Sequence, residues 1–69
     1  MYNNDDIQAM IDKVNKAGIA DKILAHISDH DKGAVRHVLE TGYYETFDQY
    51  DSDVCEKFIL AYEREARHE

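Results

Sequence analysis

Residues 3–27 read NNDDIQAMIDKVNKAGIADKILAHI, with apolar side chains at helical spacing on both sides of Gly18. On the N-terminal side, Ile7 is followed by apolar residues three, four and seven positions later, so all four lie on one face of a helix. Asn3 or Asn4 can cap this helix, and glycine is typical of the position just after a last turn. The pattern therefore predicts a first helix that ends at Gly18.

Two further helices are predicted before Gly42. Apolar residues across 19–27 repeat the helical spacing and predict a second helix of about ten residues. We expect it to stop near residues 30–31, before Gly33. Four apolar residues between 34 and 39 then share one side of a short third helix, which Gly42 closes.

The C-terminal third predicts the longest helix. Residues 43–50 can either start a helix that runs on into this last helix or form a short separate turn of helix. The separate turn is favoured, because Asp51–Asp53 are poor helix formers that prefer capping positions. The apolar face of the last helix consists of Val54, Cys55, Phe58, Ile59, Ala61 and Tyr62. The sequence thus predicts a single all-α domain over residues 1–69, a compact bundle of three to four short helices with a long C-terminal helix.

The size of the chain limits its function. A core built from 69 residues supplies roughly 3–5 kcal/mol of net stability. The one cysteine, Cys55, excludes an internal disulfide. An enclosed substrate cleft is not expected here, and the candidate catalytic groups have simpler roles: Asp51 and Asp53 as solvated caps, and Cys55 as a small apolar side chain. We predict that the protein is not an enzyme and has no cofactor.

The charge of the chain restricts its partners. Fifteen Asp and Glu against eight Lys and Arg give a formal net charge of −7. Nucleic acids and anionic membranes bind clustered Lys and Arg, so neither is expected as a direct partner. The N-terminus lacks the pattern of a secretory signal, and the longest apolar run, Phe58–Tyr62, is far shorter than a membrane span. Together with the single thiol, these features predict a cytoplasmic protein.

Acidic and aromatic residues are interleaved between Arg36 and Lys57, an interval without another Lys or Arg. Tyrosine supplies rigid contact area, and carboxylates complement a positively charged surface. One interpretation is a docking surface for a basic protein that otherwise holds nucleic acid. The other is that the aromatic rings complete a small core while the acids are solvated. The predicted partner-binding residues are Tyr43, Tyr44, Glu45, Asp48, Tyr50, Asp51 and Asp53.

Leu60 falls on the charged side of the last helix. A single exposed leucine is common. With Lys57 and Arg64 beside it, however, Leu60 can anchor a helix-to-helix contact between two copies of the chain. A small core is a physical reason to associate. The predicted self-association residues are therefore Lys57, Leu60 and Arg64.

Histidines around the second helix are candidate metal ligands. His26 and His30 would lie on adjacent turns of one helix, with His37 on the next, but a structural zinc site needs four ligands and the only cysteine is distant. No metal site is predicted. The turn at 31–33 also resembles that of a helix-turn-helix unit, yet Arg36 and His37 alone are too few basic residues to favour DNA binding.

No motif of a known family is spelled out in the chain. In size, acidity and helical content it resembles the small proteins that phages and mobile elements encode to inhibit host nucleic-acid machinery, anti-CRISPR and anti-restriction proteins among them. The leading hypothesis is a non-enzymatic module that inhibits or regulates a partner with a basic surface. The alternative is a structural or regulatory homodimer whose acidic surface serves solubility, and a helix-turn-helix DNA binder ranks third.

Overall fold

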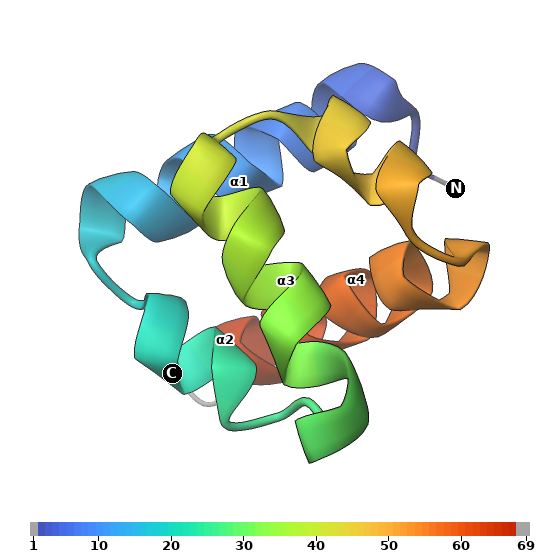
Figure 1. Cartoon of the computed structure of the whole chain (residues 1–69). Helices are drawn as coiled ribbons and strands as arrows, with labels where there is room; N and C mark the ends of the chain where they lie inside the picture. Colours follow the sequence, from blue (N-terminus) through green and yellow to red (C-terminus); the bar gives the residue numbers. More distant parts are fainter. Residues whose placement is uncertain (1, 68–69) are drawn as a thin grey trace.

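The computed structural model describes residues 2–67, and within them the protein is all-α with a long C-terminal helix, as predicted (Figure 1). The elements are the α-helices α1 (Asn4–Ala17), α2 (Ala20–Leu24), α3 (Asp29–Thr41) and α4 (Ser52–Arg67), and the 3-10 helix η1 (Tyr44–Gln49). In the described part of the chain, no helix combines the length and the apolar composition needed to cross a membrane.

Helix α1 begins and ends as its sequence predicts. Asn3 is the N-cap, and its side-chain oxygen accepts a hydrogen bond of 2.8 Å from the Asp6 N–H. The Asp6 carboxylate accepts in return from the Asn3 N–H at 3.2 Å, which completes a capping box. At the other end Gly18 adopts φ 68°, a left-handed conformation that glycine enters at little cost. Both ends of α1 are therefore determined by local chemistry.

The prediction for the second helix was wrong in its boundary. Helix α2 ends at Leu24, and residues 29–31, expected at its end, form the first turn of α3 instead. Ser28 is the N-cap of α3, and its hydroxyl donates to Asp31 Oδ2 at 2.9 Å. Acidic side chains are favourable in a first helical turn, so this polar stretch starts a helix rather than ending one. Gly33 consequently lies inside α3.

The connector between α3 and α4 forms the separate turn that was favoured. It is the 3-10 helix η1, and the extended backbone of Tyr50 (φ −128°, ψ 171°) separates it from α4. Gln8 of α1 holds the start of this connector: its side-chain amide donates to the Gly42 carbonyl at 2.7 Å and accepts from the Tyr44 N–H at 3.0 Å. The connector is thus attached to α1 across more than thirty positions of sequence.

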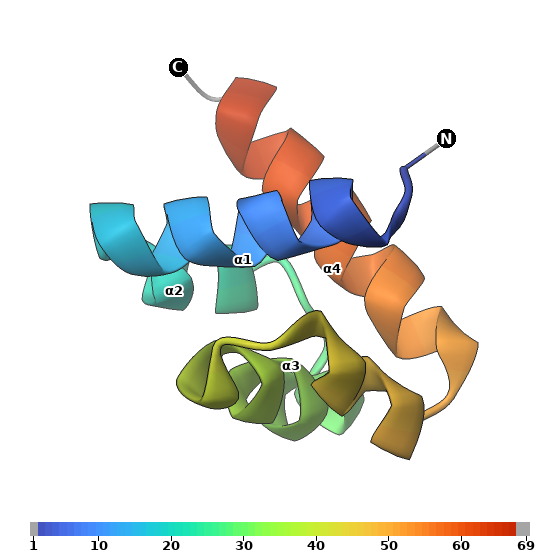
Figure 2. The same cartoon turned by 90° about the horizontal axis from the view of Figure 1, so that it is seen from above.

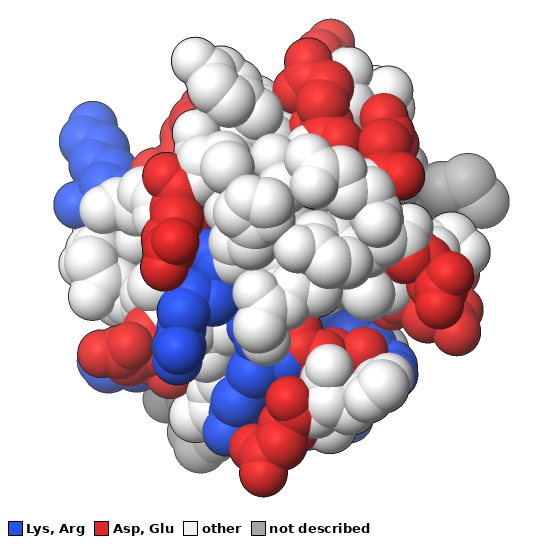
Figure 3. Space-filling model, in the orientation of Figure 1, with Lys and Arg blue, Asp and Glu red and all other residues white. Residues whose placement is uncertain are grey.

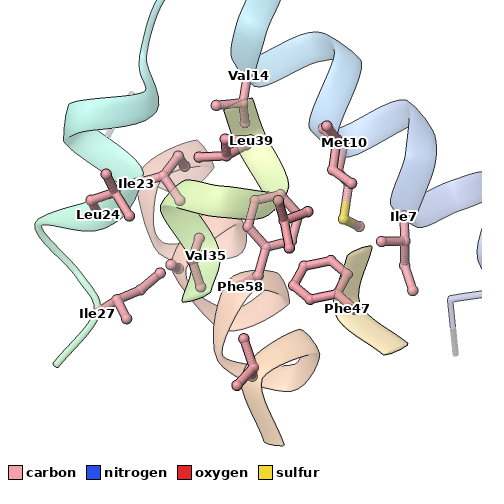
Figure 4. Close-up of a cluster of buried hydrophobic side chains, with 14 residues drawn as sticks. Ile7, Met10, Val14, Ile23, Leu24, Ile27, Val35, Leu39, Phe47 and Phe58 are labelled. Atoms are coloured by element: carbon pink, nitrogen blue, oxygen red, sulfur yellow. The ribbon is translucent and has the colours of Figure 1, made fainter. Parts of the chain in front are cut away.

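The core gathers apolar side chains from all five elements and from the α2–α3 turn (Figure 4). Phe58 of α4 is fully buried, and its ring lies 5.7 Å from that of Phe47 of η1, centroid to centroid. Burial of Phe47 draws η1 onto α3, α1 and α4. As a result, the N-terminal end of α1, η1 and the first turns of α4 lie next to one another (Figures 1 and 2). The buried core residues are Ile7, Met10, Ile11, Val14, Ile23, Leu24, Ile27, Val35, Val38, Leu39, Phe47, Val54, Phe58 and Ala61.

Candidate partner-binding groove

The acidic, aromatic segment divides between the surface and the core. All four of its predicted binding carboxylates are exposed: Glu45, Asp48, Asp51 and Asp53. Tyr43 is 65% exposed and Tyr50 is 36% exposed, whereas Tyr44 is half-buried and packs against the core. The acids therefore remain on the surface with two of the tyrosines, while Phe47 and Tyr44 turn inward.

Acidic side chains line the upper right of the face shown in Figure 3, and others lie at its left and lower edges. In Figure 3, Asp and Glu follow the upper right edge, over the N-terminal end of α1, η1 and the start of α4. Most Lys and Arg side chains visible on this face lie toward its left and lower parts. On this face, acidic side chains thus border the predicted docking segment.

A groove of about 670 Å³ opens where these three elements meet. Its floor is apolar and comes from buried or half-buried side chains, namely Ile7, Phe47, Cys55 and Ile59. Its rim carries the phenols Tyr2, Tyr44 and Tyr50 and the carboxylates Asp48 and Glu56, with Asn4 and Ser52. None of the described residues that line it is Lys or Arg. The groove therefore combines an apolar floor with a rim whose charged residues are all acidic.

Two of the rim tyrosines are held in place. The Tyr50 hydroxyl forms a 2.8 Å hydrogen bond with His37 Nδ1, and the two rings meet edge to face at 6.0 Å. The backbone of Tyr44 is bound by Gln8, and its hydroxyl accepts a long 3.5 Å hydrogen bond from the Asn4 side chain. Preorganised aromatic groups lose less conformational freedom on binding.

Three of the groove's rim residues were predicted from sequence, Tyr44, Asp48 and Tyr50, and the structure brings them together. Tyr2 and Glu56 were missed, and so was the contribution of the α1 N-terminus as a whole. Tyr43, Glu45, Asp51 and Asp53 belong to the same acidic side but do not line the groove. The role of all these residues in partner binding stays a prediction.

Cys55 lies in the groove floor without the features of a nucleophile. Burial raises the pKa of its thiol, and the neighbouring Glu56 carboxylate raises it further. A thiol with a raised pKa remains protonated near neutral pH and is a poor nucleophile. Its half-buried position agrees with its interpretation as a small apolar side chain.

The predicted pairing of histidines on one helix was wrong. His26 follows α2, whereas His30 lies in the first turn of α3, because α3 starts earlier than expected. His26 Nε2 instead contacts Glu65 Oε1 at 3.2 Å. No group of three or more His, Cys, Asp or Glu within residues 2–67 is arranged to hold a metal ion.

The turn expected for a helix-turn-helix unit was also misplaced. Residues 31–33 are helical, and α2 has only five residues. The actual turn between α2 and α3 covers residues 25–28.

An ion pair that sequence reasoning missed joins α3 to α4. Lys57 Nζ donates to Asp31 Oδ2 at 2.6 Å, and the Asp31 side chain is only 8% exposed. Hydrogen bonds from Lys57 and then from Ser28 lower the pKa of Asp31, and the bond to Asp31 raises the pKa of Lys57. This contact takes up part of the hydrogen-bonding capacity of one predicted self-association residue. The other two, Leu60 and Arg64, line a hollow of about 300 Å³ together with Lys57.

No family model, curated protein or solved structure matches the chain. What the described residues define is a small all-α domain that carries an acidic groove with an apolar floor.

Proposed function

We propose that the protein is a non-enzymatic binding module that inhibits or regulates a partner protein with a basic surface. The observation that supports this function best is the groove between α1, η1 and α4, where phenols and carboxylates surround an apolar floor. Protein interfaces combine these features: a desolvated apolar centre, aromatic contact area and a polar rim. The groove is open and 670 Å³ in volume, which suits a protruding side chain or a short segment of a partner.

The carboxylates in and near the groove favour a partner with a positively charged surface. Asp48 and Glu56 on the rim and the nearby Glu45, Asp51 and Asp53 favour Lys and Arg. The net charge of −7 also accelerates encounter with a positively charged surface at low salt. An apolar side chain flanked by Lys or Arg would meet the floor and the rim at once.

A partner that handles nucleic acid fits this chemistry best, because such proteins carry basic surfaces that grip a phosphate backbone. By covering that surface, the module excludes nucleic acid both sterically and electrostatically. This is the mode of action of a phage-type inhibitor such as an anti-CRISPR protein, working in the cytoplasm.

The proposal is tested by charge reversal on the docking side. A triple variant with Glu45, Asp48 and Asp51 changed to Lys should lose capture of the partner from a lysate of the cell in which the chain is made, as identified by mass spectrometry. Circular dichroism should show unchanged helix content, because all three side chains are exposed. Excess duplex DNA should also release the captured partner.

A matched variant controls for the change in net charge. Asp21, Asp29 and Glu40 are exposed, lie on α2 and α3, and do not line the groove. Their change to Lys alters the net charge by the same amount and should leave capture largely intact. Equal loss of capture in both triple variants, or retention in both, would show that the acidic docking side does not bind the partner.

A further inference from the structure

The outward side of α4 carries a continuous stripe of charged residues with one leucine at its centre. At about 100° per residue, all seven members of the stripe lie within about 60° of Leu60 around the helix axis. Leu60 is 53% exposed, and of the other six only Glu63 is partly buried. The stripe consists of Asp53, Glu56, Lys57, Leu60, Glu63, Arg64 and Arg67. We call this set the α4 stripe.

The charges of the α4 stripe are symmetric in position and opposite in sign about Leu60. Asp53 precedes Leu60 by seven residues and Arg67 follows it by seven. Glu56 and Arg64 are related in the same way at four residues. A third pair, Lys57 and Glu63, lies three residues on either side. Every charge in the stripe thus has its opposite at the same distance on the other side of the leucine.

We propose that the α4 stripe is the contact surface for a second copy of this chain, with the two α4 helices antiparallel and Leu60 on the twofold axis. In that arrangement each stripe charge faces its opposite on the partner: Glu56 faces the second copy's residue 64, and Asp53 faces residue 67. A twofold interface must be complementary to itself, and this charge order satisfies that condition. Antiparallel helix dipoles add a further favourable interaction.

The surroundings of Leu60 suit this contact. The hollow of about 300 Å³ beside it is bordered by α4 and by the α2–α3 turn, and its lining includes Ile27, Ala61 and the aliphatic stem of Lys57. Together with His26, Ser28 and Arg64, which also line it, this hollow offers the leucine of a second copy a mixed polar and apolar surface next to the twofold axis. Lys57 has three N–H donors, so it can keep its bond to Asp31 and still reach a carboxylate opposite.

A second copy explains the stripe better than another kind of partner does. A basic surface would face Arg64 and Arg67, and an acidic one would face Asp53 and Glu56. Parallel helices would bring like charges together. An antiparallel copy satisfies both ends of α4 at once, which a parallel copy or a partner surface of a single charge sign does not.

The proposed contact lies mostly outside the partner-docking side. The groove uses the side of α4 that carries Cys55 and Ile59; Glu56 is the stripe residue that also lines the groove, and Asp53 is the stripe residue that also belongs to the acidic docking side. Because one helix side forms a small and mainly polar contact, we expect weak association, with dimer forming between about 10 µM and 1 mM.

Sedimentation of the full chain at several concentrations tests the proposal. The wild-type chain should dimerise reversibly, and Leu60→Glu should stay monomeric, since it places two carboxylates against each other on the axis. Leu60 is exposed, so this variant should keep its helix content by circular dichroism. A chain that remains monomeric up to about 1 mM, or a dimer that Leu60→Glu leaves intact, would overturn the proposal.

A charge swap tests the antiparallel register. Glu56→Arg and Arg64→Glu should each weaken self-association by about tenfold or more, because each places like charges opposite one another. An equal mixture of the two single variants should restore dimerisation, since every 56–64 contact across the mixed pair again joins opposite charges. If the mixture dimerises no better than the separate variants, the register is wrong.

Discussion

The two sides of α4 differ in how they are built. The groove side joins the α1 N-terminus to η1 and α4, which follow one another much later in the chain. The α4 stripe needs a single helix, because its residues share one side by spacing alone. A surface assembled from distant elements depends on the whole fold, whereas a surface on one helix depends on that helix. Single variants can therefore disturb the groove side and the α4 stripe independently of each other.

The largest effect is expected from Phe58→Ala. Phe58 is fully buried on the inner side of α4, and its removal should cost about 3–5 kcal/mol of unfolding free energy. That cost equals the whole stability expected of so small a core, so both surfaces should be lost. Thermal melts followed by circular dichroism measure this, with Leu60→Ala as the exposed control on the same helix. Equal melting temperatures for the two variants would contradict the core described above.

A smaller effect, confined to the groove side, is expected from Gln8→Ala. This change removes the two hydrogen bonds that attach the connector to α1 and should cost about 1–2 kcal/mol. It should weaken partner capture while leaving self-association unchanged, because the hydrogen bonds of Gln8 run to Asp12, Gly42 and Tyr44, none of which belongs to the α4 stripe. Asp12→Asn is the control, since Asp12 is exposed and only accepts a bond from the same Gln8 amide. Unchanged stability and capture would show that Gln8 does not hold the groove together.

The smallest effect at neutral pH is expected from Asp31→Asn, since the amide oxygen can still accept a hydrogen bond from Ser28 or Lys57. The pKa of Asp31 is lowered in the folded protein from its ordinary value of 3.8. Its ionised form therefore stabilises the fold above pH 4, and this contribution is lost as the pH falls through the lowered pKa. Asp31→Asn should be less stable than the wild type above about pH 4, and the difference should shrink in more acidic solution.

Melting temperatures from pH 2 to 7 test this pH dependence. Asp29→Asn is the matched control, because Asp29 is exposed in the same helical turn. A difference between Asp31→Asn and the wild type that grows toward low pH would contradict the assigned sign.

The sequence predicted those features that depend on neighbouring residues. The all-α class, both ends of α1 and the long α4 follow from apolar spacing and from the capping residues Asn3 and Gly18. The separate turn η1 was predicted because residues 51–53 favour a new helix start over a continued one. Leu60 was placed outside by spacing alone and is exposed.

The features that were missed depend on distant partners. The start of α3 was misplaced because residues 29–31 are polar, and polar residues occur at either end of a helix. The ion pair that stabilises Asp31 comes from Lys57, twenty-six positions away in the sequence. Tyr2 and Gln8 gave no sign of their proximity to Tyr44, because no local pattern reports a contact across that distance. The acidic, aromatic character of the segment was visible, but its groove was not.

The most direct test of the central claim maps the captured partner onto the two sides of α4. Backbone amide spectra of the isotope-labelled chain should be recorded before and after addition of the partner. The groove account predicts that the largest shifts fall on Tyr44, Asp48, Cys55 and Ile59, with little change around Leu60 and Arg64. Shifts concentrated on the α4 stripe, with the groove residues unmoved, would contradict it.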